Sequence, residues 1–143
     1  MNKLQIRDEL GSRVQLRTRW VDEDNQGVLN NAVYLTLMEE ARFAYFSKLG
    51  QLSDNQFPFV LAQVETRFVA PGRGGADVMV ELATTHLGRS SFQQEYRIRD
   101  ADSGDVWCEA RALLVLWDNE SRAKMEMPSA FREAIAGLEG LPR

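Results

Sequence analysis

The strongest candidates for chemistry are three consecutive acidic residues, Asp22, Glu23 and Asp24, which precede a predicted helix. The turn formers Asn25-Gln26-Gly27 follow them, and Asn30-Asn31 stand where the helical pattern begins. The first turn of a helix presents unpaired backbone N–H groups and the positive end of the helix dipole. Such a site polarises a carbonyl and stabilises the oxyanion formed when a nucleophile attacks it.

Asp24 and the backbone N–H near Asn31 are a minimal set for hydrolysing an acyl compound. Folded back by the turn, the carboxylate could act as general base on water or attack the carbonyl directly. A structural interpretation is equally simple: the acids solvate a loop, and Asn30 or Asn31 caps the helix. The residues alone favour the structural interpretation and leave the catalytic one open.

Other catalytic sets are missing from the sequence. The single histidine, His86, lies on a predicted strand without a GxSxG motif elsewhere, so a structural or surface role is expected. The single cysteine, Cys108, excludes an intrachain disulfide and a cysteine cluster for zinc, and it is predicted to be a buried thiol. The acidic loop lacks the spacing of a calcium loop, so no metal site is expected.

The chain has 143 residues, of which 44% are hydrophobic and 27% charged, as in an ordinary globular protein. We expect one domain over residues 1–143, with its core at about 13–136. The net charge of -4 argues against nucleic acid as a partner. Without a secretory signal or an apolar run near ~18 residues, no membrane association and a cytoplasmic location are expected.

The helix is predicted from Ala32 to a stop at Gly50 and is expected to be buried on most sides, because apolar residues cover over half of its circumference. Only a narrow strip should meet water or a partner: Thr36, Glu39, Glu40, Phe43 and Ser47. Alternating patterns predict strands over residues 13–20, 57–68, 77–87, 90–99, 106–117 and a short edge strand over 122–127. A second helix, capped by Ser129, should end near Gly137.

This order predicts an α+β fold in which one curved antiparallel sheet wraps around one long helix. The consecutive strands can pair as a meander, and the strand over 106–117, apolar at every position of its second half, belongs in the middle. The helix covers only one face of the sheet. The remaining apolar stretches therefore predict that the sheet or its edge strand meets a second subunit, in a homodimer or homotetramer.

The stretch Arg19 to Arg42, RWVDEDNQGVLNNAVYLTLMEEAR, resembles the signature of the hotdog-fold acyl-CoA thioesterases of the 4-hydroxybenzoyl-CoA thioesterase family. That signature runs roughly R-x-x-D-x-D-x-x-G-H-V-N-N-x-x-Y-x-x-x-x-E-x-A-R. The similarity continues in Glu65 to Val78, in Gly88-Arg89-Ser90-Ser91-Phe92 and in Met127-Pro128. It implies the hotdog fold, hydrolysis of an acyl-CoA to the free acid, and no cofactor, because coenzyme A is part of the substrate.

Position by position, the resemblance implies that Asp24 is the catalytic carboxylate and that the Asn31 N–H faces the thioester oxygen. Glu39 matches a helix glutamate found in part of the family, where some hotdog enzymes place their catalytic acid on the helix; a position beside the substrate or a contact at an interface is the alternative. Arg89, Ser90 and Ser91 match a strand start beside the pantetheine channel, and charge and loop position suggest Arg73 and Lys124 for the phosphates. The acyl group would lie in an apolar groove at a subunit interface, for which the candidates are Tyr34, Met38, Phe57 and Phe59.

Two departures from the family pattern are visible. The family's loop histidine is replaced by Val28, and Gly75-Ala76-Asp77 is one residue longer than the family's Gly-Asp. A hydratase or dehydratase is disfavoured, because neither the loop nor the helix carries a histidine. The alternatives are a hotdog protein that binds an acyl thioester without turnover and a thioesterase that acts on acyl carrier protein.

Overall fold

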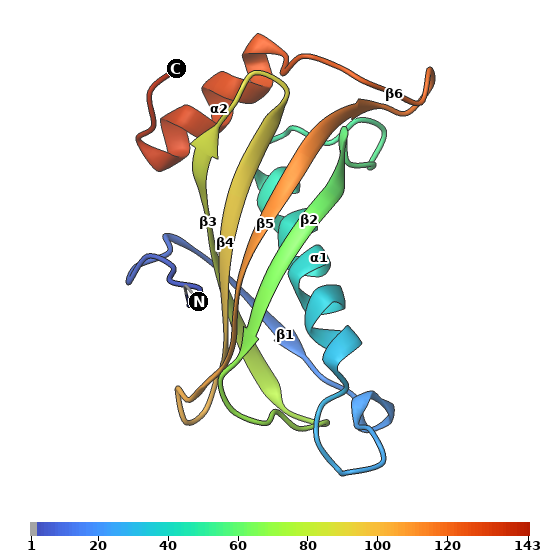
Figure 1. The fold of residues 1–143 in the computed structure, drawn as a ribbon, viewed down its shortest axis with the longest axis vertical. Coiled ribbons are helices and arrows are strands. Elements are labelled where there is room, and N and C mark those ends of the chain that lie inside the picture. Colours follow the sequence, from blue (N-terminus) through green and yellow to red (C-terminus); the bar gives the residue numbers. More distant parts are fainter. Residues whose placement is uncertain (1–2) are drawn as a thin grey trace.

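The computed structural model describes residues 3–143 and confirms the expected order of strands and helices (Figure 1). In chain order the elements are β1 (Ser12–Arg17), the 3-10 turn η1 (Trp20–Asp22), α1 (Asn31–Lys48), β2 (Phe59–Phe68), β3 (Asp77–Leu87), β4 (Ser91–Asp100), β5 (Val106–Asp118), β6 (Ala123–Lys124) and α2 (Ser129–Glu139). Within the described residues, no helix is long and apolar enough to cross a membrane.

All strand pairs are antiparallel, in the order β1-β3-β4-β5-β2, and β6 pairs with β5. β5 lies in the interior of the sheet, between β4 and the edge strand β2, although β4 and not β5 is the middle strand. The predicted meander holds for β3, β4 and β5 but is wrong for β2, which pairs with β5 instead of β3. The chain after β2 crosses the ends of β5 and β4, where Val69 N–H donates to Trp107 O and Arg73 pairs with Asp100. After this crossing the chain enters β3, which lies on the opposite side of β4 from β5 and β2.

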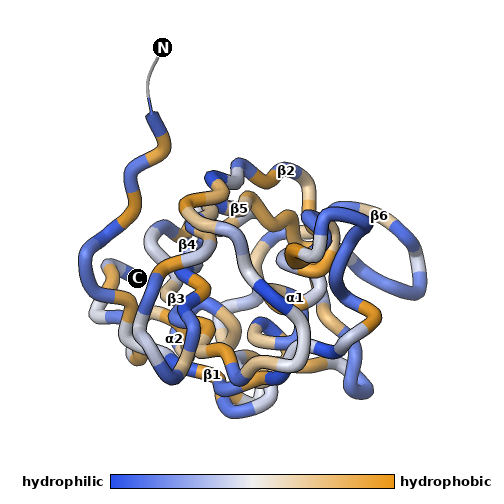
Figure 2. The backbone as a smooth tube through the Cα atoms, turned by 90° about the horizontal axis from the view of Figure 1, so that it is seen from below, coloured by the Kyte–Doolittle hydropathy of each residue, from blue (hydrophilic) through white to orange (hydrophobic). Residues whose placement is uncertain are grey.

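The sheet curves around α1, as seen from below in Figure 2, where the strands follow an arc from β2 through β5, β4 and β3 to β1. Aromatic rings fill the space between helix and sheet: Phe46 lies 4.9 Å from Phe59, 5.7 Å from Phe92 and 5.4 Å from Phe131 of α2, measured between ring centroids. The predicted exposed strip of α1 is confirmed. Leu35, predicted to be buried, is 39% exposed, so the prediction is wrong for this residue.

The helix ends explain the element boundaries. Asn30 caps α1 by accepting the Ala32 N–H at 2.9 Å, and Gly50 follows the helix with φ +69°, so the predicted stop is confirmed. The predicted cap of α2 by Ser129 is wrong. Pro128 occupies the N-cap position without a side-chain hydrogen bond, and the helix continues to Gly140, whose φ is also +69°.

The structure differs from the prediction within β2 and in the length of the last edge strand. In β2 the register shifts between Leu61 and Gln63, so Leu61 shares the inner face with Val64, contrary to the prediction. A β-bulge at this point inserts one extra residue and shifts the alternation. The last edge strand is shorter than predicted, Ala123–Lys124. It begins after Arg122, which takes a positive φ of 55° that extended strands do not adopt.

Candidate active site

Asp24 closes a small hairpin that leads directly into α1. Asn30 N–H donates to Asp22 O at 2.8 Å, Glu23 and Leu29 form a bridge, and Asp24 N–H donates to Val28 O at 2.8 Å. Gly27 turns the chain with φ +75°. The chain therefore folds back as the turn residues predicted. Asp24 lies two residues, about 7 Å along the strand, from Asp22, whose carbonyl accepts the Asn30 N–H.

The three acids of the hairpin have different surroundings. Asp22 is buried and accepts hydrogen bonds from the backbone N–H and the guanidinium of Arg19, at 2.8 and 2.9 Å. Burial alone would raise the pKa of Asp22, but the hydrogen bonds from Arg19 outweigh it and lower that pKa. Glu23 Oε2 accepts the Gly74 N–H at 2.9 Å. Both side chains therefore hold the loop in place.

Asp24 remains available for chemistry. Its Oδ1 accepts the Gln26 N–H at 2.8 Å within the same loop, and its Oδ2 has no hydrogen-bond partner within residues 3–143. At the start of α1, Asn30 accepts the N–H groups of Ala32 and Val33, whereas the Asn31 N–H has no acceptor in the described chain. The site thus combines a half-buried carboxylate and an open helix N-terminus, which suits attack on a carbonyl.

Tyr34 and Met38, two of the groove candidates, lie in the core. They are 2% and 1% exposed, respectively, and Tyr34 Oη accepts the Gly72 N–H at 3.1 Å. Burial raises the pKa of Tyr34. Little of either side chain is accessible to a substrate in this chain alone.

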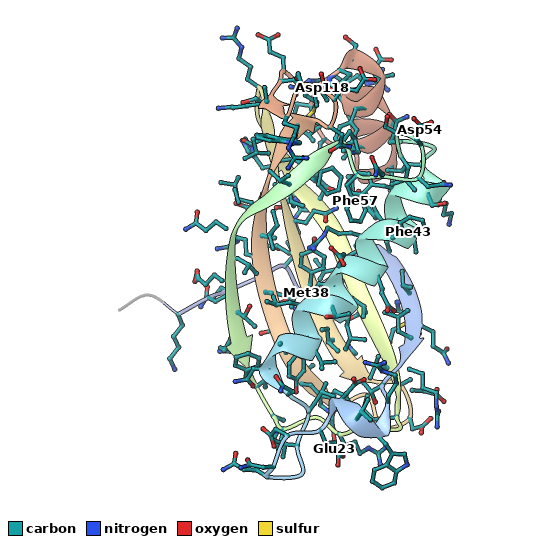
Figure 3. The ribbon with its side chains drawn as sticks, turned by 90° about the vertical axis from the view of Figure 1, so that its right-hand side faces the viewer. Glu23, Met38, Phe43, Asp54, Phe57 and Asp118 are labelled. Atoms are coloured by element: carbon teal, nitrogen blue, oxygen red, sulfur yellow. The ribbon has the colours of Figure 1, made fainter. Side chains whose placement is uncertain are left out.

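Glu39, Phe57 and Phe59 come together in a pocket of about 640 Å³ beside the exposed strip of α1. Figure 3 shows Phe43 and Phe57 close to each other, and their ring centroids are 6.3 Å apart. The pocket combines aromatic rings with polar side chains: Glu39, Glu40, Phe43, Asn55, Gln56, Phe57, Phe59, Asn119 and Arg122.

Arg89, Ser90 and Lys124 line a second hollow, of about 370 Å³. Arg89 forms an exposed ion pair with Glu126, and Ser91 begins β4. Arg73 is not part of this group, because it pairs with Asp100 near the acidic hairpin. The hollow lies beyond the far end of β3, and an 11-residue strand spans about 35 Å. In one chain, Arg89 and Asp24 therefore stand at opposite ends of the sheet.

The remaining reactive side chains lie outside these sites. Cys108 is buried, and burial raises the pKa of its thiol to about 12, so its reactive thiolate is scarce. His86 is exposed near the end of β3. Within residues 3–143, no group of three or more His, Cys, Asp or Glu side chains is placed to hold a metal ion.

A curved antiparallel sheet around one long helix, with a carboxylate hairpin at the helix start, defines a hotdog protein of the thioesterase type. The pattern of the Thioesterase-like superfamily matches residues 17–135, and the chain belongs to that superfamily. The hydrogen bonds of Tyr34 with Gly72 and of Glu23 with Gly74 were not predicted from the sequence. The only sequence signal for them is Gly72-Arg73-Gly74, whose glycines permit close backbone approach.

Among solved structures, the chain is similar to a thioesterase of Thermus thermophilus complexed with coenzyme A and Zn. The identity is 33%, the TM-score is 0.82, and the match covers 95% of this chain and 100% of that one. It is 26% identical to the 1,4-dihydroxy-2-naphthoyl-CoA hydrolase of Synechocystis, over 82% of this chain and 89% of the relative. A chloroplastic acyl-acyl carrier protein thioesterase of Arabidopsis thaliana is 23% identical over 83% of this chain, which spans only 64% of the plant protein.

Proposed function

We propose that the chain hydrolyses an acyl-CoA thioester to the free acid and coenzyme A. The observation that carries the proposal is that Asp24, whose Oδ2 is without a partner in the described chain, lies on the hairpin that leads into α1, where the Asn31 N–H is open. The similar thioesterase complexed with coenzyme A and the relative named as a CoA hydrolase support the substrate class.

In this reaction the thioester oxygen points at the start of α1. Asp24 either accepts a proton from the attacking water or attacks the carbonyl carbon itself, forming an anhydride that water then cleaves. The Asn31 N–H and the positive end of the helix dipole stabilise the oxyanion in both routes. The coenzyme A thiolate leaves, and the acid is released.

A second copy of the chain completes the proposed site. β2 is an edge strand with exposed apolar residues at both ends, and an unpaired edge favours strand pairing. An antiparallel pair of β2 strands would place the start of α1 in one subunit beside the partner's 640 Å³ pocket. The exposed residues that this contact would cover are Leu35, Phe43, Val60, Leu61, Phe68 and Val69.

The same arrangement places the end of one subunit's sheet that carries Asp24 beside the opposite end of the partner's sheet. Arg89, Ser90 and Lys124 of the partner would then bind the phosphates of a coenzyme A whose thioester lies at Asp24. The acyl group would occupy the pocket between Glu39, Phe57 and Phe59. A homodimer, or a homotetramer built from it, is therefore part of the proposal.

The test is release of free thiol from short, medium, long and aromatic acyl-CoAs. Asp24→Asn should lower kcat at least about 100-fold, the contribution expected of a general base. The asparagine oxygen can still accept the Gln26 N–H, so the loop should remain folded. Asp102→Asn, the same change at an exposed hairpin residue, is the matched control. Near wild-type turnover by Asp24→Asn would refute the assignment.

One sequence feature supports a second candidate function. Val28 stands in the hairpin where the family has a histidine, which suits a protein that binds an acyl thioester without hydrolysing it. Binding of acyl-CoA with no thiol release from any member of the series would favour this function. Release from acyl carrier protein thioesters alone would instead identify the carrier protein as the natural thiol.

A further inference from the structure

The loop Pro71–Gly75 is hydrogen-bonded to both arms of the Asp24 hairpin and to the first turns of α1. Glu23, before Asp24, accepts the Gly74 N–H at 2.9 Å. Leu29, after Asp24, donates its N–H to Gly72 O at 2.9 Å. The Gly72 N–H donates in turn to Tyr34 Oη at 3.1 Å. The backbone of Gly72 thus links α1 to the hairpin, because its N–H donates to Tyr34 and its carbonyl oxygen accepts from Leu29.

This contact is too close to admit a larger residue. A Cβ atom at Gly72 would lie 2.6 Å from the Trp107 ring and 2.8 Å from the Tyr34 hydroxyl. Trp107 is itself only 4% exposed, so it has little room to move. The Gly72 peptide is therefore held between a buried indole and a buried phenol, which fixes the position of the loop.

We propose that Tyr34 and Glu23 are positioning residues, which hold Asp24 at a fixed distance from the Asn31 N–H. Tyr34 belongs to the same helix as Asn31, one turn further on, so its hydroxyl moves rigidly with the oxyanion site. Through Gly72, Tyr34 fixes the position of the hairpin arm that follows Asp24. Through Gly74, the Glu23 carboxylate fixes the position of the arm that precedes Asp24. The expected effect on kcat rests on the proposed thioesterase function. The role of the two side chains in holding the hairpin against the loop does not.

Tyr34→Phe removes the acceptor for the Gly72 N–H and keeps the ring, which packs on Phe68 at a centroid distance of 5.3 Å. Displacement of a catalytic group by about 1 Å can lower a rate about 100-fold. We expect kcat to fall about 10-fold or more while KM stays within about twofold. Glu23→Ala should have a similar effect, and Glu23→Gln, which keeps an acceptor oxygen, should restore kcat.

Tyr45→Phe is the matched control. Tyr45 also belongs to α1, is 4% exposed, and loses hydrogen bonds to Thr84 and Glu139 in this variant. It lies near the other end of the helix. A merely structural contribution by Tyr34 would make the two variants alike, with lower stability and unchanged kcat per folded molecule.

Hydrogen–deuterium exchange tests the same proposal without turnover. In Tyr34→Phe the amide of Leu29 should exchange at least about fivefold faster than in the wild type, and in Tyr45→Phe it should not. Unchanged exchange at Leu29 would show that Tyr34 does not hold the hairpin. Faster exchange with unchanged kcat would refute the positioning of Asp24. Full activity of Asp24→Asn would refute the proposed function alone, because the exchange measurement still decides whether the hairpin is held.

Discussion

The guanidinium of Arg42 donates to the hydroxyl of Tyr96 across 3.0 Å, and both side chains are buried between α1 and the sheet. The same guanidinium lies 5.6 Å from the centroid of the Tyr96 ring, close enough for a cation–π interaction. Within residues 3–143 it has no carboxylate partner, and its Nε is buried without an acceptor. A buried charge that is only partly compensated lowers stability.

Arg42→Met is therefore predicted to raise the free energy of unfolding by about 1 kcal/mol or more, because it removes an incompletely bonded charge and keeps most of the side-chain volume. The measurement is urea unfolding at a fixed protein concentration. Arg99→Met is the contrasting variant, since Arg99 pairs with Glu81 at 2.7 Å, and it should lower stability. A loss on Arg42→Met equal to that on Arg99→Met would show that Tyr96 compensates the charge fully.

Most of the fold could be predicted from the sequence because one face of each strand is apolar. The alternation in β3 and the continuous apolar run in β5 located these strands to within a residue, and the acid-rich loop before Ala32 located the start of α1. The place of β2 in the sheet could not be predicted. Alternation shows which side chains face the core, but the neighbour of a strand depends on the path of its connecting loop, here the crossing beneath β5 and β4.

The site was predictable only in part. Local spacing identified Asp24 and Asn31, because the turn and the helix start lie within one stretch of chain. The partners of the hairpin could not be found in this way. Gly74 lies 51 positions from Glu23, and Gly72 lies 38 from Tyr34, so only the folded sheet brings them together. The burial of Arg42 was also unexpected, since charged side chains are seldom buried.

Stability at acid pH should depend on Asp22. Its folded pKa lies below the ordinary value of 3.8, so its contribution to stability is present above about pH 3.8 and is lost as the pH falls through the folded pKa. Asp22→Asn should lower stability at pH 7 and flatten the decline below pH 4. Thermal unfolding between pH 2 and 7 measures both effects. Asp102→Asn, at an exposed position, should leave the acid decline intact; an equally steep decline in Asp22→Asn would contradict the prediction.

Gly74→Ala should distort the support of the hairpin. A Cβ at Gly74 would meet the backbone oxygen of Arg19 and lie 3.1 Å from Glu23 Cγ, and a backbone atom cannot move aside as a flexible side chain can. We expect a loss of about 1–3 kcal/mol in stability and a lower kcat. Gly137→Ala is the control, because nothing lies near its Cβ position and alanine favours a helix by about 0.5–1 kcal/mol. Equal melting temperatures for the two variants would contradict the prediction.

The two-subunit site predicts complementation between two defective variants. If Asp24 of one subunit works with Arg89 and Lys124 of the other, both Asp24→Asn and the double variant Arg89→Glu/Lys124→Glu should have low kcat/KM. In a mixed dimer, the intact Asp24 faces the intact basic residues at one site, and the other site carries both defects. Random exchange makes about half of all dimers mixed, each with one intact site of two, so about a quarter of wild-type activity should return.

The measurement is kcat/KM at low acyl-CoA concentration, after equal amounts of the two variants have been unfolded together and refolded. Leu61→Arg on the β2 edge is the companion variant, because Leu61 is 42% exposed there and a charge at this position should oppose strand pairing. The Leu61→Arg variant should be monomeric, as measured by sedimentation, and should have lower activity. Recovery well below a quarter, with dimers shown to be mixed, would show that Asp24 does not work with Arg89 and Lys124 of a partner paired through β2. An active monomeric Leu61→Arg variant would lead to the same conclusion.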